Sequence, residues 1–316
     1  MNVAVFSTKG YDKSALQTVN QRFGHELTFY ETRLTSSTAA LATGFDAVCI
    51  FVNDEADRAA IAQLAAGGTR IIATRSAGYN QIDLDAAKEY GLVTVRVACP
   101  TPYLAVSEFT VGLILTLGRQ IHRAYNRVRE SNFELEGLQG FELRDKTIGV
   151  FGTGRIGASV IKNLSGFGPR LLAYDLYRNP DAEALAEYID DPLDVLRQAD
   201  IVTFHLPLTP ETHHLVNAQS LPLMKDGVFI VNTSRGALLD TAAVIEGLKS
   251  GKIGYLAIDV YEVEDALFFR DLSNEILTDD VFARLLTFPN VLVTGHQAFL
   301  TDRALRNIAE TTLQNL

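Results

Sequence analysis

Residues 147–157 read TIGVFGTGRIG, a short apolar run that ends in three glycines, Gly152, Gly154 and Gly157. A buried strand, a tight turn and a helix start are expected there in succession, because glycine allows a sharp turn and a close approach of backbone to ligand. The next apolar run, RLLAYD, ends in Asp175, 18 residues after Gly157. Glycines between a strand and a helix, with an acid at the end of the following strand, indicate a dinucleotide site.

The acid also predicts which dinucleotide is bound. Asp175 can accept hydrogen bonds from both hydroxyls of an adenosine ribose and repels a 2′-phosphate, so the pattern favours NAD. The alternative is a glycine-rich turn that binds nothing, and the acid at the expected distance argues against it.

Short β-branched runs alternate with helix-length segments along the chain. The runs are NVAVFS, LTFYE, AVCIFV, RIIATRS and TVRVA in the first hundred residues, then TIGVFG, RLLAYD, IVTFH, GVFIVNTS, YLAIDV and NVLVTG. This alternation predicts parallel βαβ units, and runs that are apolar at nearly every position predict sheets covered on both faces. We expect two open α/β sheets, the second with six strands.

The length of 316 residues suits two domains. Residues 99–103, CPTPY, interrupt the pattern with two prolines, and residues 104–129 then predict one long helix that crosses between domains. A last helical segment, residues 302–316, is expected to return to the first domain. The predicted domains are therefore residues 1–100 with 297–316, and residues 101–296.

Composition excludes several classes of partner. A net charge of −10 argues against nucleic acid, which is bound by clustered Lys and Arg. Two cysteines form neither a disulfide framework nor a metal-ligand cluster, which indicates a reducing compartment. The N-terminus does not resemble a signal peptide, and no apolar run reaches membrane-spanning length. We expect a cytoplasmic protein without a membrane partner or a bound metal.

Three strand ends carry polar residues that a core does not need: Arg235 in NTSRGAL, Glu264 in DVYEVED and His296 in TGHQAF. Each follows an apolar run, where a parallel sheet presents side chains to its ligand. A carboxylate partner favours the imidazolium, so such a histidine can donate a proton near neutral pH. Arginine grips a carboxylate with two parallel hydrogen bonds. A lone histidine is more often a surface residue, but this combination predicts that His296 is catalytic.

Other polar residues have less specific interpretations. His205 is expected to line the cofactor cleft or to be structural. His213 and His214 are adjacent, so their side chains are expected to point in different directions and to make a poor metal pair. Asp259 ends a buried strand, where an unpaired carboxylate is costly, so it should have a dedicated hydrogen-bond partner. The loop at residues 76–80 either holds substrate or is a plain βα turn.

The runs RSAGYNQIDL, GTGRIG, HLPLTPET, NTSRGAL, DVYEVE, DDVFARL and GHQAFLT together resemble the D-isomer-specific 2-hydroxyacid dehydrogenases, and within that family the bacterial D-lactate dehydrogenases. The resemblance covers essentially the whole chain. It implies a discontinuous substrate domain of flavodoxin-like fold with an inserted NAD-binding Rossmann domain. It also implies reversible, NADH-dependent reduction of pyruvate to D-lactate, or of a similar small 2-keto acid, by a homodimer or homotetramer.

The resemblance also implies roles for single residues. Arg235 would hold the substrate carboxylate and polarise the carbonyl, His296 would be the acid/base, and Glu264 would be its charge partner. Asp175 would bind the ribose, and the backbone of Arg155 and Ile156 would meet the pyrophosphate. Further positions that match the cofactor site are Gly152, Gly154, Gly157, Leu206, Pro207, Thr212, Thr233, Ser234 and Asp259. Substrate positions are Ala77 and Gly78, through backbone N–H groups, and Phe299, which limits substrate size.

One segment departs from the family pattern. Where lactate-specific relatives carry a substrate-contacting tyrosine, this chain has Pro100, and a tyrosine follows at Tyr103. We expect the Tyr103 hydroxyl to reach the substrate carboxylate; the alternative is that Tyr103 packs against the crossover helix. The departure bears on substrate preference and affinity, and not on the reaction class. Two other functions stay open: a glyoxylate or hydroxypyruvate reductase of the same fold and, because the family includes corepressors that keep the fold, a non-catalytic NADH-sensing scaffold.

Overall fold

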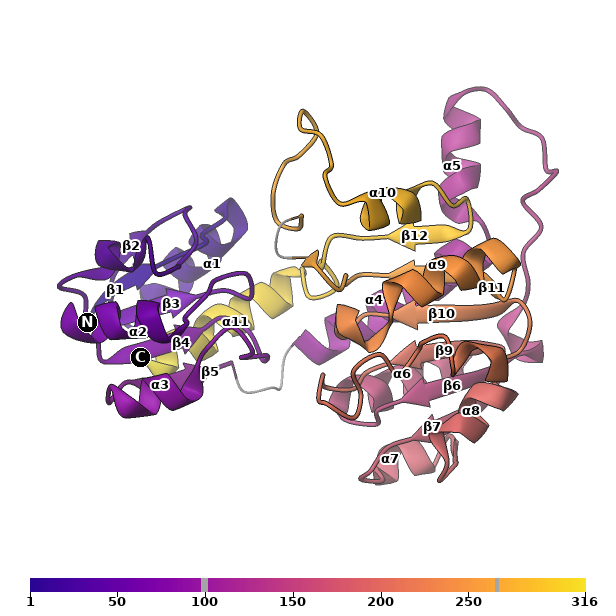
Figure 1. Cartoon of the computed structure of the whole chain (residues 1–316), viewed down its shortest axis with the longest axis horizontal. Helices are drawn as coiled ribbons and strands as arrows, with labels where there is room; N and C mark the ends of the chain where they lie inside the picture. Colours follow the sequence, from indigo (N-terminus) through magenta and orange to yellow (C-terminus); the bar gives the residue numbers. More distant parts are fainter. Residues whose placement is uncertain (98–101, 265–266) are drawn as a thin grey trace. The chain divides into compact units, whose positions relative to one another are not determined.

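The computed structural model describes residues 1–97, 102–264 and 267–316 of the chain, which forms two compact units. Unit 1 comprises Met1–Pro102 and Phe299–Leu316, and unit 2 comprises Tyr103–Ala298. Each unit contains one sheet whose described strands all pair in parallel, with helices on both faces (Figure 1). The α/β fold class predicted from the sequence is confirmed.

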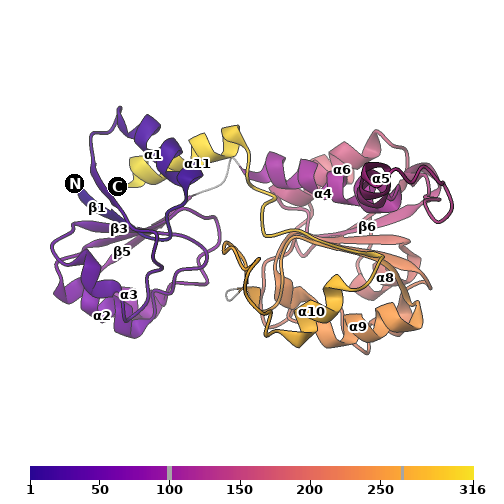
Figure 2. The ribbon, with the colours of Figure 1, turned by 90° about the horizontal axis from the view of Figure 1, so that it is seen from above.

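Unit 1 has a five-stranded sheet in the order β2-β1-β3-β4-β5. Its strands are β1 (Asn2–Val5), β2 (Glu26–Phe29), β3 (Ala47–Ile50), β4 (Ile71–Thr74) and β5 (Val93–Arg96). Its helices are α1 (Gly10–Asn20), α2 (Arg58–Ala66), α3 (Leu84–Glu89) and α11 (Asp302–Asn315), with the 3₁₀ turn η1 (Ala39–Ala42). Figure 2 shows α1 and α11 on one face of the sheet and α2 and α3 on the other.

The C-terminal helix is part of the core of unit 1. Ala309 and Leu313 of α11 are buried in one cluster with Val3 and Val5 of β1 and Leu16 of α1. The two ends of the described chain therefore share a single hydrophobic core, although all of unit 2 lies between them in the sequence.

Unit 2 has a seven-stranded sheet in the order β12-β11-β10-β9-β6-β7-β8. Its strands are β6 (Thr147–Phe151), β7 (Arg170–Tyr174), β8 (Glu187–Tyr188), β9 (Ile201–Phe204), β10 (Val228–Asn232), β11 (Ile253–Ile258) and β12 (Val291–Val293). The order reverses between β6 and β9, and an open α/β sheet binds its ligand at such a point, outside the carboxyl ends of the strands.

Helices cover both faces of this second sheet. They are α4 (Pro102–Gly118), α5 (Ile121–Arg129), α6 (Arg155–Ser165), α7 (Pro180–Glu183), α8 (Pro192–Gln198), α9 (Thr241–Ser250) and α10 (Asp280–Leu286), with the 3₁₀ turns η2 (Leu143–Asp145), η3 (Leu221–Leu223) and η4 (Gly236–Leu238). In Figure 2, α4 and α6 lie on one face, and α8, α9 and α10 lie on the other. Because helices cover both faces of the sheet, a central strand such as β10 is buried at every residue.

Two predictions about unit 2 are wrong. The single helix expected over residues 104–129 is two helices, because Gln120 takes a left-handed φ of 54° and α5 bends away from α4 by 61°. The sheet has seven strands instead of six. The additional strand, β8, is only two residues long and is not apolar, so no apolar run marks it.

No single helix in the described ranges is long and apolar enough to cross a membrane. Taken together, the bent pair α4 and α5 is long and apolar enough, but this statement rests on length and composition only. Apolar residues of α4, among them Ile114 and Leu117, belong to the core of unit 2.

Candidate active site

The glycine turn between β6 and α6 forms a cradle at the helix N-terminus. Gly152 has a left-handed φ of 89°, and a Cβ there would press on the carbonyl group of His205. A Cβ on Gly157 would collide with the carbonyl oxygen of Gly152, whereas the space around Gly154 is open. Only glycine lets α6 begin this close to the sheet, and the open side at Gly154 suits a pyrophosphate at the helix N-terminus.

Asp175 lies beside this cradle, at the end of β7. Its carboxylate accepts hydrogen bonds from the Thr153 backbone N–H (2.5 Å) and the Tyr177 backbone N–H (3.0 Å). The nearby Arg178 guanidinium forms ion pairs with Glu183 (3.2 Å) and Asp190 (2.8 Å). The Asp175 carboxylate is held in place, and the Arg178 guanidinium is paired with Glu183 and Asp190. This arrangement suits the free ribose hydroxyls of NAD better than a 2′-phosphate.

The other expected cofactor residues follow β9 and β10, at the same edge of the sheet. The Ser234 hydroxyl donates to the Leu206 carbonyl (2.6 Å), and the Thr212 hydroxyl donates to the Pro207 carbonyl (2.7 Å). Thr233 is buried and shares a hydrogen bond with a threonine of α4. The bond from Ser234 to Leu206 connects the loop after β10 with the loop after β9. Arg155 and Ile156 begin α6, next to the glycine cradle.

His205 directly follows β9, beside the glycine turn. Its Nε2 lies 3.0 Å from the Thr203 hydroxyl, and its Nδ1 is sealed from solvent without a hydrogen-bond partner among the described residues. Burial lowers the pKa of His205 to about 3. The ring is therefore neutral near pH 7 and is a poor proton donor, in agreement with a structural or cleft-lining residue.

Arg235, Glu264 and His296 follow β10, β11 and β12, which are neighbours in the sheet. The structure brings the acid and the imidazole together: His296 Nδ1 lies 2.8 Å from Glu264 Oε1. The other carboxylate oxygen of Glu264 accepts a hydrogen bond from the Tyr261 backbone N–H (3.0 Å). Both side chains are about one-fifth exposed, at 19% and 21%, so the pair remains reachable from solvent.

Arg235 lies within electrostatic reach of this pair. Burial lowers the pKa of its guanidinium, and the negative charge of Glu264 acts in the opposite direction. A guanidinium keeps its charge at physiological pH, so the site contains a partly buried cation beside a carboxylate–imidazole pair. The Arg235 Nη1 donates to the Ser234 carbonyl (2.6 Å), in the loop after β10 that also carries expected cofactor residues.

The loop that carries His296 is held by Asp259. His296 has a left-handed φ of 51°. The fully buried Asp259 carboxylate accepts hydrogen bonds from the backbone of Gln297 (2.9 Å) and Ala298 (2.8 Å) and from the Thr294 hydroxyl. Burial raises the pKa of Asp259, and these hydrogen bonds act to lower it. The predicted dedicated partners of Asp259 are confirmed.

One aromatic residue beside the pair was missed by the sequence analysis. The Phe269 ring lies 5.7 Å from the His296 ring, and Phe269 also has a left-handed φ, of 63°. Its only signal in the sequence is the aromatic pair FF shortly after DVYEVED. An apolar neighbour of this kind limits water around the imidazole.

The expected substrate loop lies in unit 1, after β4. The Ser76 hydroxyl donates to the Gly78 carbonyl (2.6 Å), and Arg96 donates to the Ala77 carbonyl (2.8 Å). Arg75, fully buried just before the loop, donates to main-chain carbonyls that follow β1 and to one of β3. The loop is thus braced through its carbonyl groups at the carboxyl edge of the sheet.

The remaining substrate positions lie in different parts of the chain. Phe299 packs against Phe51 in unit 1, with ring centroids 5.9 Å apart. Tyr103 lies in the first turn of α4 in unit 2 and is partly buried. Cys99 and Pro100, where the chain departs from the family pattern, lie outside the described residues.

The prediction that His213 and His214 point in different directions is wrong. Their rings stack, with centroids 3.8 Å apart and planes 25° apart. The reason is the left-handed φ of 52° at His214, which turns its side chain to the same side as that of His213. This conformation depends on contacts that the local sequence does not show.

Comparisons with known proteins agree with this geometry. Residues 111–298 match the family model described as D-isomer specific 2-hydroxyacid dehydrogenase, NAD binding domain. The D-lactate dehydrogenase of Escherichia coli (strain K12) is 54% identical over 319 residues, which cover 100% of this chain and 96% of that protein. Its apo-structure aligns with a TM-score of 0.89 at 51% identity, covering 100% of this chain and 95% of that one. The structure of the pyruvate reductase of Chlamydomonas reinhardtii aligns with a TM-score of 0.92 at 43% identity and the same coverage. The chain therefore belongs to the D-isomer specific 2-hydroxyacid dehydrogenase family and is an NAD-dependent enzyme of that family.

Proposed function

We propose that this enzyme reduces pyruvate to D-lactate with NADH, in a reversible reaction. The observation that carries the proposal is the hydrogen bond between His296 and Glu264 beside the partly buried cation of Arg235, in the segments that follow three neighbouring strands. The names of two similar proteins, a D-lactate dehydrogenase and a pyruvate reductase, support pyruvate as the substrate.

Arg235 binds and polarises the substrate. Its planar guanidinium holds the carboxylate and directs a donor toward the C2 carbonyl oxygen, where negative charge develops. Burial of the guanidinium strengthens this interaction, because few water molecules compete with the substrate. Backbone N–H groups of Ala77 and Gly78 supply further donors to the carboxylate.

His296 supplies the proton of the reduction. Its Nδ1 is engaged with Glu264, so Nε2 is the nitrogen that donates to the developing alkoxide. The Glu264 carboxylate fixes the orientation of the imidazole ring through this contact. NADH, when bound, supplies the hydride that C2 accepts. One hydride to carbon and one proton from His296 to oxygen complete the alcohol, and His296 is left neutral.

We propose that the sheet edge of unit 2 holds the cofactor. The N-terminus of α6, with the backbone of Arg155 and Ile156, binds the pyrophosphate, and Asp175 binds the adenosine ribose. The residues that line the adenine and nicotinamide positions are Leu206, Pro207, Thr212, Thr233, Ser234 and Asp259. In unit 1, Phe299 limits the size of the substrate. The Tyr103 hydroxyl donates a hydrogen bond to the substrate carboxylate. It takes over the role of the family's tyrosine, whose sequence position is occupied here by Pro100.

The test follows NADH absorbance with pyruvate, glyoxylate, hydroxypyruvate and longer 2-keto acids, and then determines the chirality of the product. We expect the highest kcat/KM with pyruvate and a D product. A higher kcat/KM with glyoxylate or hydroxypyruvate would move the assignment to a reductase of that substrate. NADH binding without turnover of any 2-keto acid would instead identify the non-catalytic sensor.

We also propose that the enzyme is a homo-oligomer. Apolar side chains stand exposed on α5 and on the segment that follows it: Ile121, Tyr125, Val128, Phe133 and Leu135. Several large apolar residues exposed along one helix and its loop mark a surface that a second protein chain can cover.

A further inference from the structure

Three metal-ligating side chains that the proposed reaction does not use lie together in unit 2. His213, His214 and Glu262 each place a ligand atom within 4.8 Å of the other two. They form the one such group of three His, Cys, Asp or Glu residues found in the described part of the chain. The histidines follow β9 and the glutamate follows β11. His213 is exposed and the other two are partly buried, so an ion can enter from solvent.

The backbone at His214 holds the two imidazoles on one side. Its left-handed conformation stacks the ring on that of His213. The conformation is fixed at both ends of the residue: the His214 N–H donates to the Ala237 carbonyl (2.8 Å), and the His214 carbonyl accepts from the Asn217 side chain (2.7 Å). The loop backbone therefore keeps both imidazoles on the same side, while the exposed His213 ring itself is held by no hydrogen bond in these contacts.

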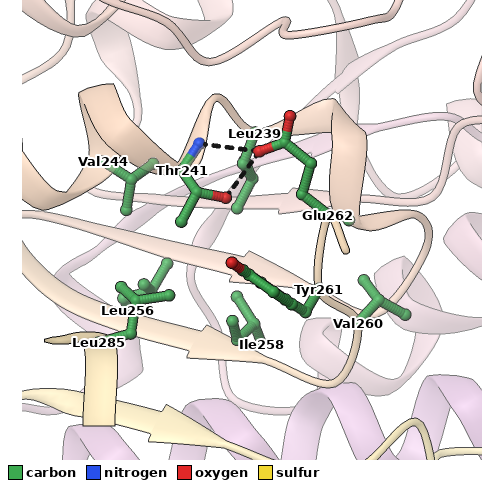
Figure 3. A pocket seen from close by; sticks show the side chains of 10 residues that line it. Leu239, Thr241, Val244, Leu256, Ile258, Val260, Tyr261, Glu262 and Leu285 are labelled. Atoms are coloured by element: carbon green, nitrogen blue, oxygen red, sulfur yellow. Dashed lines mark hydrogen bonds between the residues drawn. The ribbon is translucent and has the colours of Figure 1, made fainter. Parts of the chain in front are cut away.

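The glutamate is oriented by a second contact, as ligating carboxylates usually are. One oxygen, Oε1, lies 2.6 Å from His214 Nε2. The other, Oε2, accepts from the Thr241 hydroxyl (2.8 Å) and the Thr241 backbone N–H (3.3 Å) at the start of α9. Figure 3 shows both bonds between Glu262 and Thr241. Thr241 thus leaves the first oxygen directed at the histidines.

We propose that His213, His214 and Glu262 bind a zinc ion. Two imidazole nitrogens and one carboxylate oxygen are a ligand set that Zn²⁺ takes, with water as the fourth ligand. The ion takes the place of the direct contact between His214 Nε2 and Glu262 Oε1, and the exposed His213 ring turns out of the stack to supply its nitrogen. The site is separate from His296 and Glu264, whose side chains are paired with each other.

The bound ion would join two loops that lead to the active site. Glu262 precedes Glu264 by two residues, and its backbone N packs so closely on Gly236, next to Arg235, that a Cβ there would collide. Because zinc binds the folded chain only when these loops are in place, it should raise the midpoint of thermal unfolding.

The test is calorimetric titration of zinc chloride into the full chain after treatment with a chelator. We expect one equivalent of zinc per chain, with a Kd that rises at least about tenfold in His213→Ala and in Glu262→Gln. Thr241→Val should weaken binding by about tenfold, and Thr241→Ser, which keeps the hydroxyl, should restore it. Melting of each variant without zinc shows that it is folded, and the exposed position of His213 makes His213→Ala the safest of them.

Two control variants locate the ion. His25→Gln in unit 1 and His296→Ala at the catalytic pair should both retain the full equivalent of zinc. Loss of binding in His296→Ala would place the ion on the catalytic pair and overturn the proposal. Unchanged affinity in both His213→Ala and Glu262→Gln, or no uptake by the parent protein, would overturn it as well.

Discussion

His296 combines a strained backbone with a fixed side chain. A left-handed φ at a residue other than glycine costs about 1–3 kcal/mol and persists only where the surroundings hold it. Asp259 supplies that support through hydrogen bonds on both sides of His296, and Glu264 fixes the ring. The left-handed backbone and the contact with Glu264 together direct the imidazole to the sheet edge where substrate is expected.

His296→Ala tests the role of this residue. We expect kcat for pyruvate to fall about 10²-fold or more, the usual contribution of a general acid, while the Kd for NADH stays within about twofold. His25→Gln is the matched control and should keep full turnover. Retention of most of the activity in His296→Ala would assign the proton transfer to another group.

Asp175 predicts the choice of cofactor. Its carboxylate is fixed by Thr153 and Tyr177, and the Arg178 guanidinium is held by two acids, so neither group favours a 2′-phosphate. We expect kcat/KM with NADH to exceed that with NADPH by at least about tenfold, since one unfavourable charge contact is worth about 1.4 kcal/mol or more. Asp175→Ala should narrow this ratio, and equal efficiencies in the parent enzyme would show that Asp175 does not face the ribose.

His205 predicts a pH dependence of stability. Its pKa falls from 6.5 to about 3 on burial, so between these values the unfolded chain binds one proton more than the folded chain. The stability that depends on neutral His205 is complete above pH 6.5 and is lost as pH falls, by up to about 1.4 kcal/mol per pH unit. Urea unfolding at pH 7, 6 and 5 should show a steeper acid loss in the parent than in His205→Asn. Parallel curves of unfolding free energy against pH for the two proteins would contradict the lowered pKa of His205.

At the scale of single elements, α6 depends on its glycine. Gly157→Ala would force a Cβ into the carbonyl oxygen of Gly152 and push the helix away from β6. We expect a loss of about 1–3 kcal/mol of stability, as for overpacking, and a weaker NADH complex, both measurable by thermal unfolding and titration. Gly112→Ala on α4 is the control: the position is exposed with nothing near its Cβ, and alanine there should add about 0.5–1 kcal/mol. Equal behaviour of the two variants would refute the steric argument.

The elements that the sequence predicts correctly are those with a strong local signal. Apolar or β-branched runs mark eleven of the described strands, and central strands covered on both faces, such as β3 and β6, are buried at nearly every residue. The polar strand β8 has no such signal, and the bend at Gln120 lies within a run that remains helical by composition. Local preference does not record a left-handed residue that tertiary contacts impose.

The candidate site follows the same rule. Arg235, Glu264 and His296 could be predicted as a group because each follows a recognisable strand, and β10, β11 and β12 are neighbours. The stacked pair His213 and His214 could not, because it depends on the hydrogen bond from His214 to Ala237, far along the chain. Asp259 lies between these cases: its need for partners could be predicted, but the identity of those partners could not.

At the scale of the whole molecule, the exposed apolar residues of α5 and its loop predict association. Phe133 and Leu135 are 73% and 80% exposed. Replacing both with glutamate should dissociate the homo-oligomer, because charge at the centre of an apolar interface is costly to bury. Light scattering after gel filtration measures the mass. Ile276→Glu, at a position elsewhere in unit 2 that is 91% exposed, should leave the mass unchanged. A parent protein that is already monomeric would reject the prediction.

The shared core of α1, β1 and α11 has a consequence for synthesis on the ribosome. Ala309 and Leu313 complete one face of the sheet of unit 1, but they are translated only after the whole of Tyr103–Ala298. At about 5–20 residues per second, that interval lasts roughly 10 to 40 s. Unit 2 is one continuous segment and can fold as it emerges, whereas the nascent unit 1 must wait with an apolar face uncovered. Chaperones that hold apolar surfaces therefore have their longest opportunity on residues 1–102, which are made before unit 2 and finish folding after it.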